Sequence, residues 1–176
     1  MPSDLPSFAA SRALAETLLA DHRPEWWRHA QAAAREAVRL AQLPGVDRDP
    51  LLHAAVLLDV GRSPVVARVG FPSLDAARFL RVRGYPRRVV GLVAHQLASD
   101  VEAEQAGVDL SGFAAEDSPT ADTLWWCSLV ADTSAAPLAV GDGRADTDGR
   151  RRDATRGAVA RTRDRIDAAG LPVVVP

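Results

Sequence analysis

The sequence predicts an all-α protein, a single-domain bundle of about seven to eight helices. Three observations favour this fold class. Apolar residues recur at spacings of three and four along most of the 176-residue chain, which is the period of an α-helix. Prolines and capping residues open these segments, and glycines or prolines close them. The chain has neither the alternation typical of paired strands nor a hairpin signal nor an internal repeat.

The first three helices have clear boundaries in the sequence. Apolar residues at mixed three- and four-residue spacing predict a helix over residues 5–20. Pro24 suits the first turn of a second helix, which runs to about residue 42 and is stopped by Leu43-Pro44-Gly45. Asp49-Pro50 opens a third helix, whose second half is apolar nearly all round up to Gly61. We expect this third segment to be the central buried helix.

The second half of the chain continues the same pattern. Pro72 or Ser73 starts a fourth helix that Gly84 ends, and Pro86 starts a fifth that reaches about Ala98. The remaining segments are a short helix at 101–106, a long apolar helix capped by Ser118-Pro119, a glycine-rich flexible loop at 137–149, an arginine-rich terminal helix at 150–170 and a tail at 171–176. The main helical domain therefore covers residues 1–136, and the terminal helix packs on the same domain.

Composition excludes several kinds of function. The formal net charge of -2 gives no overall attraction to nucleic acid or to an anionic membrane. Every basic side chain apart from the histidines is an arginine, so chemistry that needs a lysine amine is excluded. A single cysteine, Cys127, allows no internal disulfide, and we expect a cytoplasmic protein. No apolar stretch approaches the roughly 20 residues of a membrane span, and we expect no secretory signal.

Three polar side chains in apolar helical surroundings are candidates for chemistry. They are His29 in the second helix, Asp59 at the end of the third and His95 near the end of the fifth. A carboxylate and imidazoles that converge from different helices can hold a divalent metal in a bundle. The other interpretation is that each is a separately hydrogen-bonded core residue. Spacing alone favours that second interpretation, since no pair has the tight spacing of a motif such as HExxH.

The order of the segments resembles the HD-domain superfamily of metal-dependent phosphohydrolases, and in particular the small HD-domain proteins of actinobacteria. The resemblance covers roughly residues 5–135. It is carried by five segments, which are Trp27-Arg28-His29, Ala54–Gly61, Gly70–Ala77, Val93-Ala94-His95 and Leu124–Cys127. It implies an all-α fold of the HD type, and a site where a metal-bound water would attack a phosphoester.

The resemblance also implies that the metal site is eroded. The first metal-binding histidine of the family matches His29, the aspartate of the His-Asp doublet matches Asp59, and the first histidine of a later pair matches His95. The other ligand positions of the family fall on Leu58 in place of the doublet histidine, on Pro72 and on Gln96. A leucine cannot bind a metal, and two metals are out of reach with these losses.

The distal aspartate of the family falls on Ser128. Asp132 lies four residues further along, on the same face of the helix one turn later, and could replace it. The metal would then sit about 5–6 Å from its usual place, which is a large displacement beside metal–ligand bonds of about 2 Å.

We therefore favour a metal-free protein that binds a ligand or a partner in the old cleft without catalysis. The alternative is a mononuclear phosphohydrolase in which His29, Asp59 and Asp132, with or without His95, hold one Mn, Fe or Zn ion. Asp59 would then be the catalytic residue. The cofactor is thus either none or a single divalent transition metal.

Two arginines are candidates for binding the phosphate or another ligand, namely Arg28 and Arg62. In the metal-free protein a buried Asp59 needs an arginine or a helix N-terminus as its partner, and the same two arginines are candidates for that role. Leu58 and Pro72 replace polar ligands by apolar groups, which would help the site persist without metal.

The candidate partners are a small-molecule ligand, a protein, or a second copy of the chain in a homodimer. A weaker alternative is nucleic-acid binding through the arginines of the terminal helix. Acidic residues are interspersed with these arginines and no aromatic residue accompanies them, so a solvated face with ion pairs is the favoured interpretation.

We interpret the other histidines, the tryptophans and the cysteine as structural residues. We expect His22 to be exposed and His53 to be a surface or boundary residue. One tryptophan of each pair, Trp26-Trp27 and Trp125-Trp126, should lie in the core while the other lines a pocket or an interface. Cys127 should be an inert buried thiol.

Overall fold

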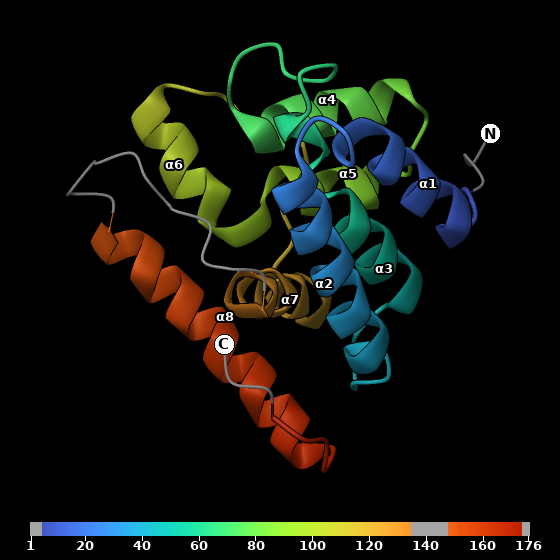
Figure 1. The fold of residues 1–176 in the computed structure, drawn as a ribbon. Coiled ribbons are helices and arrows are strands. Elements are labelled where there is room, and N and C mark those ends of the chain that lie inside the picture. Colours follow the sequence, from blue (N-terminus) through green and yellow to red (C-terminus); the bar gives the residue numbers. More distant parts are fainter. Residues whose placement is uncertain (1–4, 135–147, 174–176) are drawn as a thin grey trace.

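A computed structural model describes residues 5–134 and 148–173, apart from the side chains at positions 98, 132–134, 148–152 and 154. The described residues form α-helices and short 3-10 turns with no strand, which confirms the all-α fold class (Figure 1). The elements in chain order are α1 (Phe8–Leu19), α2 (Pro24–Leu40), α3 (Arg48–Leu57), η1 (Val60–Arg62), α4 (Pro72–Val82), α5 (Arg87–Ala94), η2 (Gln96–Ala98), α6 (Ser99–Ala106), α7 (Pro119–Ser134) and α8 (Asp148–Ala168).

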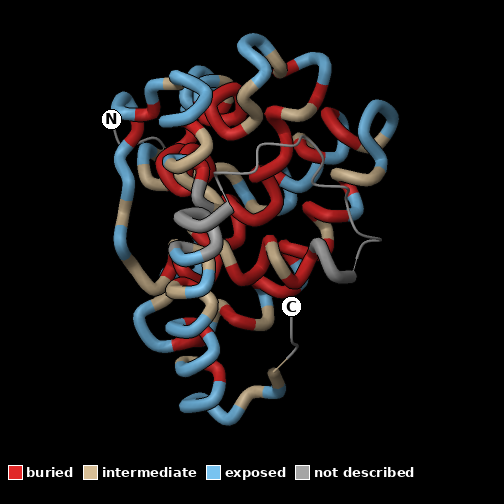
Figure 2. Tube along the Cα trace, turned by 90° about the vertical axis from the view of Figure 1, so that its left-hand side faces the viewer, coloured by how far each residue is buried: buried red, intermediate tan, exposed pale blue. Residues whose placement is uncertain are grey.

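Helix α3 lies at the centre of the bundle, as its apolar sequence predicts. It packs against α1, α2, α5 and α7, and every residue from Leu51 to Leu57 is buried. The buried part of the chain gathers around it, while exposed segments form the periphery (Figure 2). Helix α2 contributes a second buried stripe that faces α7, because its small alanines allow the two helices to approach closely.

The third helix ends earlier than its apolar pattern predicts. Helix α3 stops at Leu57, and Asp59 lies in the following turn rather than on the helix. The N–H of Arg62 bonds to the carbonyl of Asp59 at 2.9 Å, three residues back, so the chain tightens into the 3-10 turn η1. An apolar run does not distinguish a helix from a buried turn, which explains the error.

The fifth helix is also shorter than expected. It ends at Ala94 instead of Ala98, and His95 is its C-cap. The reason is a kink at Leu97, which adopts a left-handed conformation with φ 40° and ψ 59° that a helix cannot contain. The kink lies inside η2 and precedes α6, which begins two residues before the expected sixth helix.

The terminal helix α8 lies along the outside of the bundle against α7 (Figure 1). Among its described side chains, those of Ala158, Thr162 and Ile166 are buried and form a narrow stripe. Its first two residues, 148 and 149, belong to the segment expected as a flexible loop, and residues 137–147 of that segment lie outside the described residues. No described helix combines the length and the apolar character needed to cross a membrane.

The turn η1 crosses the start of α4 so closely that only glycine fits at position 61. A Cβ atom built on Gly61 would lie 1.9 Å from the carbonyl oxygen of Pro72 and 2.8 Å from the backbone nitrogen of Ala76. Because backbone atoms form the obstacle, no side-chain rotation can relieve it. The crossing therefore fixes where the chain after Asp59 runs.

We expect Gly61→Ala to lower the free energy of unfolding by about 1–3 kcal/mol or more, since the methyl group forces the turn away from α4. Urea unfolding followed by circular dichroism measures this change. Gly112→Ala is the matched control, because the nearest atom to its added Cβ is the flexible Arg81 side chain at 3.9 Å. Equal stability of the two variants would contradict the close crossing.

Candidate functional site

Two of the predicted ligand residues meet in the core. The Nδ1 atom of His29, on α2, lies 2.6 Å from Oδ2 of Asp59, in the turn after α3. Both side chains are almost completely buried, with 2% and 3% of their surface exposed. The Nε2 atom of His29 faces the backbone carbonyl of Ser128 on α7 at 3.1 Å. The pair thus joins α2, α7 and the turn after α3.

The partners of His29 determine how protons are distributed in this pair. A carbonyl oxygen only accepts hydrogen bonds, so Nε2 carries a hydrogen and donates to Ser128. The Nδ1 atom and Oδ2 of Asp59 form a short hydrogen bond at 2.6 Å. The imidazole and the carboxylate therefore satisfy each other, which offsets the cost of burying both groups.

The second carboxylate oxygen of Asp59 connects the pair to the surface. Its Oδ1 atom lies 3.4 Å from Nε of Arg62, a long hydrogen bond. The guanidinium of Arg62 stacks 3.5 Å from the centre of the Trp26 ring, and Trp26 in turn packs edge-on against His29. Arg62 is therefore the arginine partner of Asp59, whereas the other candidate, Arg28, is exposed on α2.

A second guanidinium lies beside Arg62. The Nε atom of Arg23 donates to the backbone carbonyl of Arg62 at 3.3 Å, which places the Arg23 guanidinium next to the end of η1. We call the surface formed by Arg23, Trp26 and Arg62 the arginine mouth. It covers the buried His29–Asp59 pair and carries two positive charges against the single carboxylate below.

His95 takes part in a different set of contacts. Its Nδ1 atom lies 2.6 Å from Oδ1 of Asp100, and its Nε2 atom donates to the carbonyl of Phe113 at 2.9 Å. The indole N–H of Trp125 donates to the backbone carbonyl of His95 at 3.3 Å. Both ring nitrogens are therefore occupied, and the structure does not bring His95 to the His29–Asp59 pair.

Leu58 and Gln96 occupy two positions at which the resemblance expects metal-binding histidines, and these two residues contact each other. The side-chain amide of Gln96 donates to the backbone carbonyl of Leu58 at 2.7 Å. Leu58 itself is buried, with 1% of its surface exposed. Pro72 begins α4 and contributes the carbonyl that Gly61 approaches. All three replacements thus have structural roles in the same region.

The metal-binding hypothesis can be compared with the side chains that the structure describes. No group of three or more His, Cys, Asp or Glu side chains among them is arranged to hold a metal ion. Ser128, the position expected for the distal acid, offers its backbone carbonyl to His29. The side chain of Asp132, the proposed replacement for that acid, lies outside the described residues.

The interpretation of His53 as a surface or boundary residue is wrong. His53 is 3% exposed, and its Nδ1 atom lies 2.8 Å from the hydroxyl of Ser11, which is also 2.9 Å from the hydroxyl of Tyr85. Phe8 packs edge-on against the imidazole. The error arose because α1 covers the first turns of α3, and a single helix pattern does not reveal which neighbour covers it.

The other structural interpretations are confirmed. His22 is exposed, Trp27 and Trp126 are buried, and Trp26 and Trp125 are only partly buried. Cys127 is completely buried, and this burial raises the pKa of its thiol well above the usual value. A thiol that stays protonated is a poor nucleophile, so Cys127 is inert.

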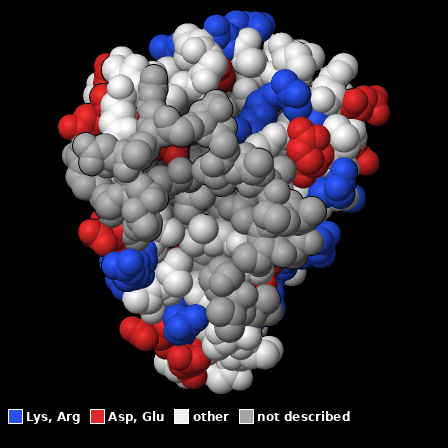
Figure 3. Space-filling view, turned by 60° about the vertical axis from the view of Figure 1, so that its left-hand side comes forward, with Lys and Arg blue, Asp and Glu red and all other residues white. Residues whose placement is uncertain are grey.

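The arginines described in the terminal helix include several that form ion pairs. Arg161 and Arg165 bind the carboxylate of Asp122 on α7, at 2.6 Å and 3.1 Å, and this contact raises the pKa of Arg161. Arg156 pairs with Asp153 at 3.1 Å. Arginine and acidic side chains also lie interspersed on the described part of the face in Figure 3. These contacts are those of the ion-paired, solvated face that the sequence favours.

Sequence reasoning missed the roles of Asp100 and Gln96. Asp100 follows His95 by five residues, but the kink at Leu97 lies between them and determines that they meet. Gln96 reaches Leu58, which is 38 positions away in the chain. Neither contact has a local spacing signal. No family model, no curated protein and no solved structure matches the chain.

The buried His53 predicts an acid-sensitive fold. Burial lowers the pKa of His53, while the charge of Asp49 opposes part of this shift. At pH values above the usual histidine pKa of about 6.5, both the folded and the unfolded chains have a neutral His53. Below it the unfolded chain takes up a proton that the folded chain resists, so the stability contributed by neutral His53 is lost as pH falls toward its folded pKa.

We expect urea unfolding to show this loss as the pH falls below about 6.5, at no more than about 1.4 kcal/mol per pH unit from this residue. His53→Gln should reduce the slope of unfolding free energy against pH over that range. His22→Gln, at an exposed histidine, should leave the slope unchanged. An identical slope for the wild type and His53→Gln would contradict this assignment.

Proposed function

We propose that the chain is a metal-independent binding protein with an HD-like helical architecture, and that it acts without catalysis. The observation that carries this proposal is the contact between His29 and Asp59 at 2.6 Å. A metal bound by both groups at about 2 Å each would hold the two atoms further apart. The described contacts instead use the imidazole and the carboxylate as partners for each other and for the backbone of Ser128.

The replacements around the pair support the same proposal. A leucine at position 58 fills the core, and the amide of Gln96 binds the Leu58 carbonyl. A metal site that had lost one ligand would leave its remaining polar groups unpaired, at a cost in stability. Here Asp59 and Gln96 each have a described hydrogen-bond partner, which supports a hydrogen-bonded core that needs no metal.

The ligand we propose is a small anion-bearing molecule, such as a phosphorylated compound, held at the arginine mouth. Stacking on Trp26 and the contact with Asp59 orient Arg62, whose described hydrogen bond uses only Nε. Within the described part of the chain, its two terminal nitrogens donate to no residue. An oriented guanidinium with open terminal donors suits phosphate or carboxylate, and Arg23 adds a second charge.

The second candidate is a mononuclear phosphohydrolase. It is favoured by one observation, the meeting of His29 and Asp59 from separate elements of the bundle. This candidate requires Mn, Fe or Zn to separate the two side chains and to recruit at least one further ligand. The two candidates therefore make opposite predictions about the effect of metal on stability.

We expect the melting temperature of the wild type to be the same in chelator and with added Mn, Fe or Zn. Asp59→Ala should lower the free energy of unfolding by about 3 kcal/mol in both conditions, because it removes the buried carboxylate that the His29 imidazole contacts at 2.6 Å. Differential scanning calorimetry and elemental analysis measure the two quantities. The exposed Asp109→Ala is the control for non-specific binding of metal to acidic residues.

The opposite result would favour the phosphohydrolase. In that case the purified wild type would contain about one equivalent of transition metal, added metal would raise its melting temperature, and Asp59→Ala would abolish both effects. Metal bound equally by the wild type and Asp59→Ala would instead indicate a surface site unrelated to the pair.

Arg62→Gln should weaken the binding of pyrophosphate at least about tenfold, because it removes the oriented charge but keeps a polar side chain. Isothermal titration calorimetry measures this affinity. Arg28→Gln tests the second predicted arginine and should have a smaller effect, since Arg28 is exposed. Arg48→Gln, at the start of α3, is the charge-matched control. Equal losses in all three variants would show that only overall charge matters.

A further inference from the structure

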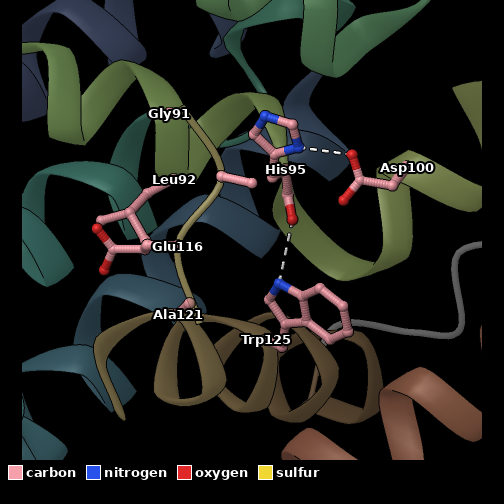
Figure 4. A pocket seen from close by; sticks show the side chains of 8 residues that line it. Gly91, Leu92, His95, Asp100, Glu116, Ala121 and Trp125 are labelled. Carbon is pink, nitrogen blue, oxygen red and sulfur yellow. Dashed lines mark hydrogen bonds and ion pairs between the residues drawn. The ribbon is translucent and has the colours of Figure 1, made fainter. Parts of the chain in front are cut away.

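A second candidate site lies away from the arginine mouth, between α5, α6 and α7 (Figure 4). It is a small, partly open pocket with a cavity volume of about 60 Å³. Its walls are mostly apolar, and its polar groups are an imidazole, two carboxylates and an indole. The lining residues are Gly91, Leu92, His95, Asp100, Ala115, Glu116, Ala121 and Trp125.

The wall formed by residues 113–116 is held rigidly against α5. A Cβ atom built on Gly91 would lie 2.2 Å from the carbonyl oxygen of Ala114, so the glycine permits a direct approach of the two backbones. His95 donates to the Phe113 carbonyl, and Arg88 binds the carboxylate of Glu116 with two nitrogens, at 2.8 and 3.1 Å. The pocket is therefore preorganised and does not depend on a ligand for its shape.

The polar groups of the pocket are not equivalent. Both oxygens of Glu116 accept from Arg88, and one of them also accepts from the hydroxyl of Ser118. Asp100 uses only Oδ1, toward His95, and more than half of its side chain is exposed. Its Oδ2 atom accepts from no described residue. Asp100 is thus the carboxylate with an open oxygen for a ligand.

The charge of this part of the chain favours a cation. Residues 89–134 contain no arginine or lysine. The same segment contains eight acidic residues, which are Asp100, Glu102, Glu104, Asp109, Glu116, Asp117, Asp122 and Asp132. Basic residues from other segments compensate some of them, Arg88 at Glu116 and Arg161 at Asp122. All residues that line the pocket belong to this segment, which contributes acidic but no basic side chains of its own and so favours a cation.

Trp125 lines the same pocket as Asp100 and provides an aromatic surface. Its indole N–H already donates to the carbonyl of His95, so the ring itself is what it can offer to a ligand (Figure 4). A tryptophan ring attracts ammonium groups, and the attraction is stronger where water is excluded. The apolar atoms of Leu92 and Ala121 suit methyl or methylene groups. Carboxylate, indole and apolar wall are complementary to one class of ligand.

We propose that this pocket binds a small organic cation, an alkylated ammonium or amine head group, between Asp100 and Trp125. The cation would pair with Oδ2 of Asp100, pack on the indole ring and place its carbon atoms against Leu92 and Ala121. A site of this kind is separate from the arginine mouth, which selects the opposite charge. The chain would then have two ligand sites of opposite sign.

The test is titration of the full chain with choline, putrescine and agmatine, followed by the indole ¹H–¹⁵N signal of Trp125. The neutral isostere of choline, 3,3-dimethyl-1-butanol, separates charge recognition from apolar binding. We expect saturable binding of at least one cation at millimolar concentration or better, and binding of the neutral isostere at least about tenfold weaker.

Asp100→Asn should weaken cation binding at least about tenfold while keeping the size of the side chain. Trp125→Leu should also weaken it, with ligand-observed saturation transfer as the readout because the indole signal is lost. Asp109→Asn is the matched control, since it removes the same charge from the same acidic segment outside the pocket. Circular dichroism of each variant confirms that it is folded.

Three results would overturn the proposal. The first is the absence of binding for all three cations. The second is equal binding of choline and its neutral isostere, which would indicate an apolar pocket only. The third is an equal loss in Asp100→Asn and Asp109→Asn, which would indicate diffuse attraction to the acidic segment and no defined site.

Discussion

A buried imidazole and a buried carboxylate connect parts of the chain that are far apart in sequence. His29 belongs to α2, Asp59 follows α3, and the carbonyl of Ser128 belongs to α7. Neither side chain would tolerate burial alone, because removing an unpaired charge from water costs several kcal/mol. Since each satisfies the other, α2 and α7 can pack closely around the end of α3. The positions of η1 and of the arginine mouth follow from this contact and from the tight crossing at Gly61.

The fold could be predicted from the sequence where the pattern is long and regular. The apolar run of α3 marks it as the central helix, and the order of the segments singled out His29 and Asp59, which do meet. The parts that could not be predicted depend on contacts between distant segments. His53 is buried because α1 covers it, and the bend after His95 depends on a leucine in a left-handed conformation that no propensity favours.

The two candidate sites differ in charge because arginines and acids are segregated along the chain. Arg23 and Arg62 come from the segments around α2 and η1, whereas Asp100 and Trp125 come from a segment without basic residues. The same segregation explains how α8 is attached. Its narrow apolar stripe supplies little burial, and Arg161 and Arg165 bind the acidic α7 through Asp122. Local charge thus contributes both to the assembly of the bundle and to the selectivity of its surfaces.

The contact between His29 and Ser128 also bears on folding during synthesis. His29 and Asp59 are 30 positions apart, so they are both available early on a growing chain. The Ser128 carbonyl that accepts from Nε2 of His29 is 99 positions from the imidazole and emerges from the ribosome much later. Until then water must solvate that N–H, and the apolar face of α2 has no α7 to cover it. The contact with Ser128 therefore forms only after α7 has been translated, and until then the buried stripe of α2 is exposed to water.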